Sequence, residues 1–326
     1  MDRKKYKYEM KPLFRERMQT LMPDETDFAE FEKIVHTNPI NFIRCNTLKT
    51  TPDQLLQRLR KKWEVIQPYP EFPEIMLIKS TLGPGELGNA TEHLLGLYYV
   101  QEISSMMSIL ALNPQPGELI LDLCASPGSK TSQAAAKMQN SGTIIANDLH
   151  LGRIKILSST LERCGVTNTI ATKGDAVAFC SRLSKSNFPK FDKILLDAPC
   201  SGEGTLRSSP KTFLMWNHKV VKKLSRQQKK LIAFAFKCLK KDGVLVYSTC
   251  THAPEENEEV VNFALKNFPV ELQDIKLPLK TRKGLTSWQN ESFSPSLNKT
   301  HRIYPQDNDS EGFFVSRLIL KEEIKD

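Results

Sequence analysis

The sequence lacks the patterns that would assign it to a membrane, secreted or fibrous class of protein. No stretch approaches the roughly 18 apolar residues that span a bilayer, and residues 1–11, MDRKKYKYEMK, are too polar for a secretory signal. Internal repeats and low-complexity tracts are also absent. We therefore expect a globular, soluble protein of the cytoplasm.

The cysteine pattern lacks the features of a disulfide framework or a zinc site. The chain has seven cysteines, an odd number, and they are spread along the sequence without a CxxC pair. We expect no metal site. The thiols are then available for packing in the core or for catalysis.

Positive charge is abundant and unevenly distributed. The formal net charge is +9, which suits a polyanionic partner. Residues 205–241 hold eleven lysines and arginines and no acidic residue. Such a block is compatible with a phosphate-binding path and equally with the solvated face of an amphipathic helix.

A turn-rich segment, STLGPGELGN at residues 80–89, divides the patterned part of the chain. We predict a small N-terminal α+β domain of RNA-binding type over residues 1–95 and a larger domain over 96–326. The small domain should contain a helix over 51–62, capped by Thr51 or Asp53. Its expected strands lie at 41–48, 63–69 and 74–80.

The larger part alternates short apolar strands with helical stretches. The expected strands are residues 118–124, 143–149, 168–174, 193–199 and 243–250. Continuous apolar strands between helices predict an α/β fold with a parallel sheet covered on both faces. In such a sheet, ligands bind at the carboxyl ends of the strands, where the polar residues of this sequence gather.

The first of these strands leads into a glycine-containing turn, CASPGSKT, that suits a nucleoside ligand. Asp148 ends the second strand about twenty residues after Gly128, where nucleotide-binding folds place an acid against ribose hydroxyls, and Asp175 ends the third. Each acid alone is more simply a helix cap. Because GxGxxG and GxxxxGK[ST] are both absent, the expected cofactor is S-adenosylmethionine.

The fourth and fifth strands end in cysteine motifs, DAPCSG at 197–202 and STCT at 248–251. Carbon 5 of a pyrimidine becomes nucleophilic when a thiolate adds at carbon 6, and a carboxylic acid near N3 stabilises the charge that develops on the ring. Asp197 lies three positions before Cys200, and the sequence offers candidates for each of these roles. Methyltransferases that act on amino groups tend to carry an aromatic residue where this chain has Cys200. The residues leave open whether Cys200 or Cys250 attacks.

These motifs closely resemble those of the NOL1/NOP2/Sun family of RNA cytosine-5 methyltransferases. The matching segments are NFIRCNTLK, YVQEISSM, LDLCASPGSKT, LLDAPCSGEGTLR, GVLVYSTCT with PEENEEVV, and RIYPQ…EGFF. The resemblance implies a Rossmann-like methyltransferase sheet, with Cys250 as nucleophile and Cys200 assisting product release. It further implies that Asp197 contacts the base and that Lys130 organises the target pocket.

The resemblance also implies a set of residues around the cofactor. They are Cys124, Ala125, Ser126, Pro127, Gly128, Ser129, Lys130, Asp148, Arg153, Asp175 and Asp197. The expected partner is RNA. A short chain without an appended C-terminal RNA-binding module favours tRNA over rRNA, by family analogy.

Three alternatives and three side chains complete the expectations. A non-catalytic RNA-binding or assembly factor, an rRNA enzyme and a DNA enzyme remain as other functions. His252 is expected to be an exposed loop residue. Phe213 and Trp216 are expected either to stack on RNA bases or to anchor the basic helix to the sheet.

Overall fold

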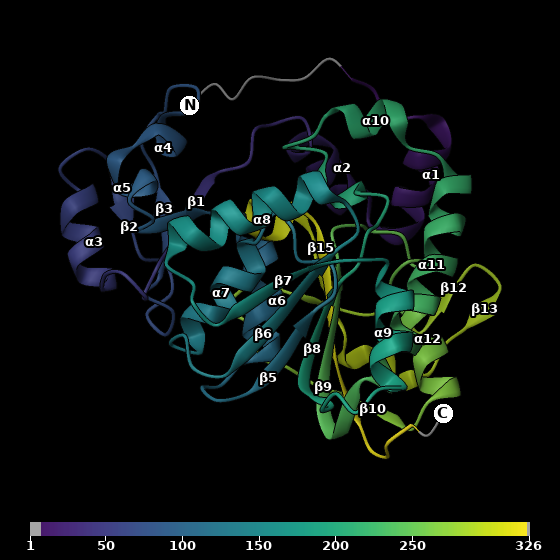
Figure 1. Ribbon diagram of the computed structural model, residues 1–326. Coiled ribbons are helices and arrows are strands. Elements are labelled where there is room, and N and C mark those ends of the chain that lie inside the picture. The colour runs from purple at the N-terminus through teal and green to yellow at the C-terminus, as the bar shows by residue number, and fades with distance from the viewer. Residues whose placement is uncertain (1–7, 325–326) are drawn as a thin grey trace.

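Two sheets organise the chain, and they lie side by side in Figure 1. The computed structural model describes residues 8–324. No helix in this part of the chain is long and apolar enough to cross a membrane. The smaller sheet precedes the larger one in the sequence, and the chain passes from one to the other between Val100 and Ile103.

The small sheet is antiparallel and has the strand order β2-β3-β1-β4. Its strands are β1 (Asn41–Cys45), β2 (Val65–Ile66), β3 (Ile75–Ile78) and β4 (Tyr98–Val100). Helix α3 (Pro52–Leu59) begins at Thr51, which forms a capping box with Gln54, so Thr51 rather than Asp53 is the cap. Leu55 and Leu59 of α3 pack against Ile43 and Met76 of this sheet. Two short helices, α4 (Glu86–Asn89) and α5 (Thr91–Leu94), precede β4.

The large sheet contains the five predicted strands, all parallel. In spatial order they are β7 (Thr169–Lys173), β6 (Thr143–Asp148), β5 (Leu119–Asp122), β8 (Phe191–Asp197) and β9 (Leu239–Thr249). The chain order reverses at β5, whose neighbours are β6 and β8. In an open α/β sheet such a switch point marks the crevice in which ligands bind.

Antiparallel strands extend the sheet beyond β9. They are β15 (Phe313–Leu320), which pairs with β9, then β14 (His301–Ile303) and β11 (Arg282–Lys283), while β10 (Val270–Gln273) pairs with β15. A short hairpin, β12 (Ser287–Trp288) and β13 (Glu291–Ser292), stands apart from the sheet. Chain segments far apart in sequence therefore meet at β9.

Helices cover both faces of the large sheet because its strands are apolar at consecutive positions. On β5, Ile120 packs with helices α6 (Ile103–Leu112) and α7 (Ser129–Lys137), whereas Leu121 packs on the opposite face. Helix α8 (Leu151–Cys164) covers Ala146 on the first face. The opposite face carries α9 (Ala176–Ser184), α11 (His218–Lys237) and α12 (Glu258–Asn267).

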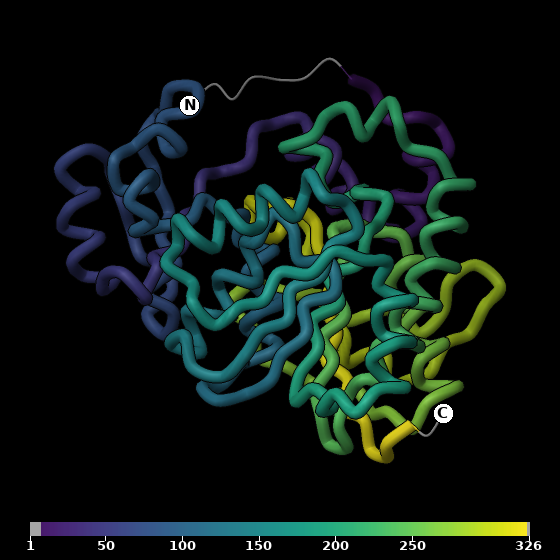
Figure 2. The backbone as a smooth tube through the Cα atoms, viewed as in Figure 1, coloured from purple at the N-terminus to yellow at the C-terminus, as the bar shows by residue number. Residues whose placement is uncertain are grey.

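The first two helices pack on the large sheet's side of the molecule and not on the small sheet. Helices α1 (Pro12–Leu21) and α2 (Glu25–Ile34) bury Phe14 and Phe31 against Phe213, Trp216 and Tyr304. Figure 2 shows this N-terminal stretch beside the green segment that contains α10 (Lys211–Met215).

Phe213 and Trp216 are therefore core residues. They are 2% and 6% exposed, which excludes the predicted stacking on RNA. The other prediction, that these rings anchor the basic helix to the sheet, was only partly correct. They do pack in the core, but they contact the N-terminal helices and not the sheet.

Candidate active site

A cavity of about 400 Å³ lies at the carboxyl ends of the parallel strands, beside the switch point. Ligand sites in proteins commonly have this size. The residues predicted from sequence that line it are Cys124, Ser126, Asp148, Arg153, Asp175, Asp197, Cys200 and Cys250. The other predicted residues, Ala125, Pro127, Gly128, Ser129 and Lys130, belong to the turn after β5 and to the start of α7.

The turn after β5 needs a glycine for two reasons. Gly128 has a φ of +102°, which L side chains rarely adopt. A Cβ at this position would also lie 3.0 Å from Leu157 Cδ1 and 3.1 Å from Thr160 Cγ2. The turn therefore stays narrow, and α7 begins at Ser129.

A buried arginine from the small sheet holds this turn from behind. Arg44 of β1 donates one hydrogen bond of 2.8 Å to the Ser129 carbonyl and one of 2.9 Å to Ser132 Oγ, and its guanidinium also contacts Gln101. Burial lowers the pKa of Arg44 to about 10. Sequence reasoning missed this role, although an arginine inside an apolar strand is a signal of an internal partner.

The two acids expected at the ribose make different hydrogen bonds within the protein. Asp148 Oδ2 accepts hydrogen bonds from the Ser126 amide at 3.3 Å and from Arg153 Nε at 3.0 Å, so it ties the turn to α8. Asp175 Oδ1 accepts from the Ala178 amide at 2.9 Å and so caps α9. Both carboxyl groups still line the cavity.

The two cysteines at the ends of neighbouring strands form a close pair. Pairing of Asp197 with Ser248 in adjacent strands brings the following loops together, and Cys200 Sγ lies 3.2 Å from Cys250 Sγ. The hydrogen bond to Cys250 and burial raise the pKa of Cys200 well above its usual value, and the nearby Glu256 adds to this effect. Cys200 is therefore a protonated thiol at neutral pH.

An ion pair stands next to the thiols. Lys130 Nζ lies 2.8 Å from Asp197 Oδ2, and the Lys130 ammonium also interacts electrostatically with Cys250. Burial lowers the pKa of Lys130, but attraction to Asp197 outweighs it and leaves the pKa above its usual value. Asp197 Oδ1 accepts a 2.7 Å hydrogen bond from Ser248 Oγ, so both of its oxygens have partners.

Two buried carboxyl groups that sequence reasoning missed flank this arrangement. Burial raises the pKa of Asp122 to about 7 and that of Glu256 to about 7. Glu256 Oε2 accepts from the Ser201 amide at 3.0 Å and from Gln228 Nε2 at 2.8 Å, which fixes the loop that carries Cys200. Glu256 belongs to the acidic run PEENEEVV. Such runs are normally exposed to solvent, so the pattern gave no sign that this carboxyl group is buried.

His252 contradicts the predicted exposed loop position. It is only 2% exposed, and its ring stacks on Tyr304 with the ring centres 5.0 Å apart. Burial and the nearby Arg302 lower the pKa of His252 to about 3. The prediction failed because β14 and the segment after it, remote in sequence, fold over this loop.

The basic block of residues 205–241 divides into buried and exposed parts. Arg207 is fully buried, where it bonds to the Ser310 carbonyl at 2.8 Å and to Asp309, so it cannot belong to a surface phosphate path. The exposed members within α11 are Lys219, Lys222, Lys223, Arg226 and Lys230.

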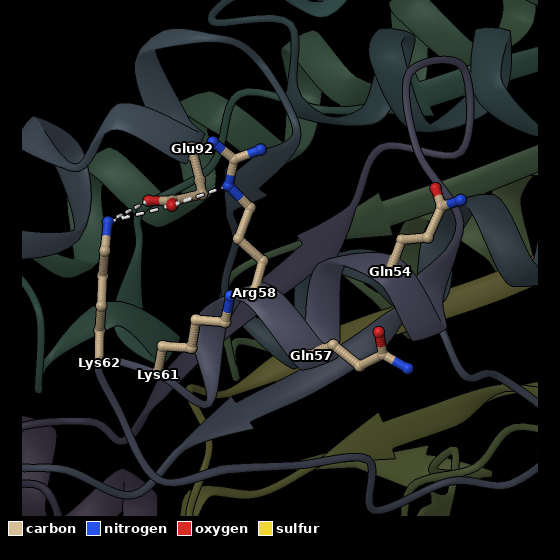
Figure 3. Close-up of a pocket in the computed structure, with 6 residues that line it drawn as sticks. All are labelled: Gln54, Gln57, Arg58, Lys61, Lys62 and Glu92. Carbon is tan, nitrogen blue, oxygen red and sulfur yellow. Dashed lines mark hydrogen bonds and ion pairs between the residues drawn. The ribbon is translucent and has the colours of Figure 1, made fainter.

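A second hollow lies on the small domain and has a different character (Figure 3). It is formed by α3 and the segment around Glu92, whose carboxylate already pairs with Arg58 at 3.1 Å and Lys62 at 2.8 Å. Neither thiol lines it. Within residues 8–324, no group of three histidine, cysteine or acidic residues is placed to hold a metal ion.

The fold and the cavity define the class. A parallel sheet that reverses at β5, with an antiparallel strand beside β9 and acids at the ends of β6 and β7, is the α/β fold of S-adenosylmethionine-dependent methyltransferases. Residues 109–319 match the family of 16S rRNA methyltransferase RsmB/F, and residues 10–103 match the N-terminal domain of 16S rRNA methyltransferase RsmF. The chain belongs to the RsmB/F family of RNA cytosine-5 methyltransferases, which confirms the NOL1/NOP2/Sun resemblance.

Relatives of two kinds match most of the chain. The tRNA (cytosine(49)-C(5))-methyltransferase of Pyrococcus abyssi is 44% identical over 277 residues, which are 85% of this chain and 86% of that one. Ribosomal RNA small subunit methyltransferase F of Psychromonas ingrahamii is 37% identical over 94% of this chain. The match spans only 62% of that longer relative.

Solved structures agree in fold. A methyltransferase homolog protein from Pyrococcus horikoshii superposes with a TM-score of 0.82 at 32% identity, over 94% of both chains. NSun6 from Pyrococcus horikoshii with SFG superposes with a TM-score of 0.81 at 23% identity, over 98% of this chain and all of that one.

Proposed function

We propose that this protein transfers a methyl group from S-adenosylmethionine to carbon 5 of a cytosine in RNA, with Cys250 as the covalent nucleophile and tRNA as the favoured substrate. The observation that carries the proposal is the thiol pair, 3.2 Å apart, beside the Lys130–Asp197 ion pair and on the wall of one cavity.

The donors around the cavity fit the cofactor. Asp148 and Asp175 offer carboxylate oxygens for ribose hydroxyls, and Arg153 and the backbone of the turn offer donors for the carboxylate of an amino acid. Bound there, S-adenosylmethionine supplies an electrophilic methyl group. Cys124 and Ser126 would line its site, while Ala125, Pro127, Gly128 and Ser129 would shape the turn that holds it.

The two thiols have different surroundings, and the difference supports separate roles for them. Cys250 stands near the Lys130 ammonium, whereas Cys200 is buried near the Glu256 carboxyl, and its raised pKa keeps it protonated. Cys250 therefore attacks carbon 6 of the ring. Asp197, whose oxygens accept hydrogen bonds from Ser248 and pair with Lys130, would also accept from the exocyclic amino group that cytosine has and uracil lacks.

Release of the product reverses the covalent step. A base takes the carbon 5 proton, the electrons of that C–H bond re-form the ring double bond, and the electrons of the C6–S bond leave on Cys250. Cys200 Sγ lies 3.2 Å from Cys250 Sγ, so a protonated Cys200 would donate a hydrogen bond to the departing thiolate and stabilise it.

The mechanism is tested with two variants incubated with S-adenosylmethionine and RNA. Cys250→Ala should abolish methyl transfer. Cys200→Ala should accumulate a covalent protein–RNA adduct that survives a denaturing gel, because attack continues while release fails. Full activity of Cys250→Ala would refute the proposal, and an adduct with Cys250→Ala would reverse the roles.

The preference for tRNA is supported by sequence identity. This chain is 44% identical to a relative named for tRNA and 37% identical to one named for ribosomal RNA. Unmodified tRNA transcripts and ribosomal RNA fragments should be compared as substrates, with bisulfite sequencing of the products. Methylation of ribosomal RNA alone would exclude the tRNA preference, and cofactor binding without turnover on either would favour a non-catalytic RNA-binding factor.

A further inference from the structure

Helix α11 presents two unlike faces. Its inner face buries Leu231, Ile232 and Phe236 in the core against the large sheet. Its outer face carries Lys219, Lys222, Lys223, Arg226 and Lys230, all exposed, which are called the basic stripe below. The helix stands between α9 and α12 and can be followed in Figure 1.

The basic stripe is a single line of charge along the helix. Its members follow Lys219 by three, four, seven and eleven positions, so they fall within an arc of about 100° and extend over about 16 Å. Helix α11 contains no acidic residue. Over residues 8–324 none of the five forms an ion pair, whereas Lys229 on the flank of the stripe pairs with Glu259 at 2.6 Å.

The stripe runs beside the active-site cavity. Gln227, next to Arg226 in sequence, lines that cavity together with Leu231. Gln228 donates hydrogen bonds of 2.9 Å to the Pro199 carbonyl and 2.8 Å to Glu256 Oε2. The helix is therefore anchored to the loop of Cys200, and the stripe keeps a fixed position relative to the thiols.

Exposed apolar side chains adjoin the amino-terminal end of the stripe. Met215 is 76% exposed, Leu214 is 56% exposed and Val220 is 44% exposed. An apolar surface beside a line of lysines suits a strand of RNA, which presents phosphates on one side and unstacked bases on the other. An acidic protein would contact the lysines but would gain nothing from the exposed apolar side chains beside them.

We propose that the basic stripe of α11 binds the phosphates of the RNA strand that leads to the target cytosine, while Leu214, Met215 and Val220 contact its unstacked bases. This inference rests on the proposed function and names the surface that guides the substrate to the cavity. Each lysine that neutralises a phosphate releases counterions, so the contact depends steeply on salt.

Two variants of equal charge test the inference. The stripe variant carries Lys219→Gln, Lys222→Gln, Lys223→Gln and Lys230→Gln. The control variant carries Lys185→Gln, Lys241→Gln, Lys266→Gln and Lys321→Gln, which are exposed lysines at the ends of elements remote from the cavity. Binding to a fluorescein-labelled tRNA transcript and to a short single-stranded RNA is measured over a range of salt concentrations.

The stripe variant should bind RNA at least about tenfold more weakly at low salt, and the slope of log affinity against log salt should fall by about 3 for four lost contacts. The control variant should keep both values close to those of the wild type. Binding of S-adenosylmethionine and the melting temperature should be unchanged in both, because all eight side chains are exposed.

If the two variants lost RNA affinity equally, only net charge would matter and the inference would be overturned. It would also be overturned if the salt slope of the stripe variant did not change. Polyglutamate serves as a model of an acidic protein. If the stripe variant lost binding to polyglutamate but kept binding to RNA, the stripe would instead be a site for an acidic protein. Because binding is measured without methyl transfer, a failure of the proposed function appears separately, as wild-type protein that binds RNA and does not methylate it.

Discussion

Glu256 is a buried acid beside the Cys200 loop, and its environment makes stability depend on pH. The folded protein holds the Glu256 proton up to about pH 7, whereas the unfolded chain loses it near the ordinary value of 4.5. The stabilisation that comes from this tighter proton binding is complete below the pKa of Glu256 in the unfolded chain, and it is lost as the pH rises through 7.

Glu256→Gln should therefore be more stable than the wild type at pH 8, by about 1–3 kcal/mol, and close to it at pH 5. Glutamine keeps an oxygen that can accept from Ser201 and Gln228. Urea unfolding across this pH range measures the difference, with the exposed Glu291→Gln as control. A difference that does not change with pH would mean that Glu256 is ionised throughout.

Single residues show where sequence reasoning succeeds and where it stops. The residues of the two cysteine motifs were predictable because adjacent parallel strands end at one edge of a sheet, and that rule needs only the strand pattern. The burial of His252 and Arg207 was not predictable, because it depends on residues 301–311, which return to the site from the end of the chain. Their contacts leave no local pattern.

Among the elements, strand β1 has a role that extends beyond its own sheet. Arg44 is buried, and its hydrogen-bond acceptors are Gln101, the Ser129 carbonyl and Ser132 Oγ, so it holds the start of α7. A guanidinium reaches several acceptors in fixed directions, and a lysine ammonium cannot reproduce that fork.

Arg44→Lys should raise the KM for S-adenosylmethionine, by about tenfold, with a smaller effect on kcat, because the turn behind the cofactor loses a donor at the Ser129 carbonyl. Steady-state kinetics at saturating RNA measure the split between KM and kcat. Arg60→Lys, on the exposed surface of the same domain, is the control. A fall in kcat alone would contradict this positioning role.

The elements themselves were largely predictable, and the exceptions have a physical cause. The five parallel strands are buried on both faces and give unbroken apolar runs. By contrast, residues 63–69 form a strand only at Val65–Ile66, because β2 is the outer strand of the small sheet and pairs on one side alone. The predicted division at residues 95 and 96 stays a prediction.

At the scale of the whole molecule, a buried ion pair joins the first helix to the loop after Cys250. Arg17 Nη1 lies 3.0 Å from Glu255 Oε1 and Arg17 Nη2 lies 2.7 Å from Glu255 Oε2, with both side chains buried. Breaking one partner of such a pair leaves an uncompensated buried charge.

Arg17→Met should lower the free energy of unfolding by about 3–5 kcal/mol, and adding Glu255→Gln should restore most of it. Urea unfolding of the two single variants and the double variant measures their coupling. Additive losses would show that the two side chains do not interact. Arg15→Met, which removes a partly exposed arginine of the same helix, is the control.

The docking of α1 and α2 also has a consequence for synthesis on the ribosome. These helices are made well before Trp216 and Tyr304, which cover their aromatic side chains. At ordinary rates of translation, Phe14 and Phe31 wait about 15–60 s before Tyr304 follows them out. For that time the earliest part of the chain carries an apolar surface without its partner, and it is then that chaperones would meet this protein.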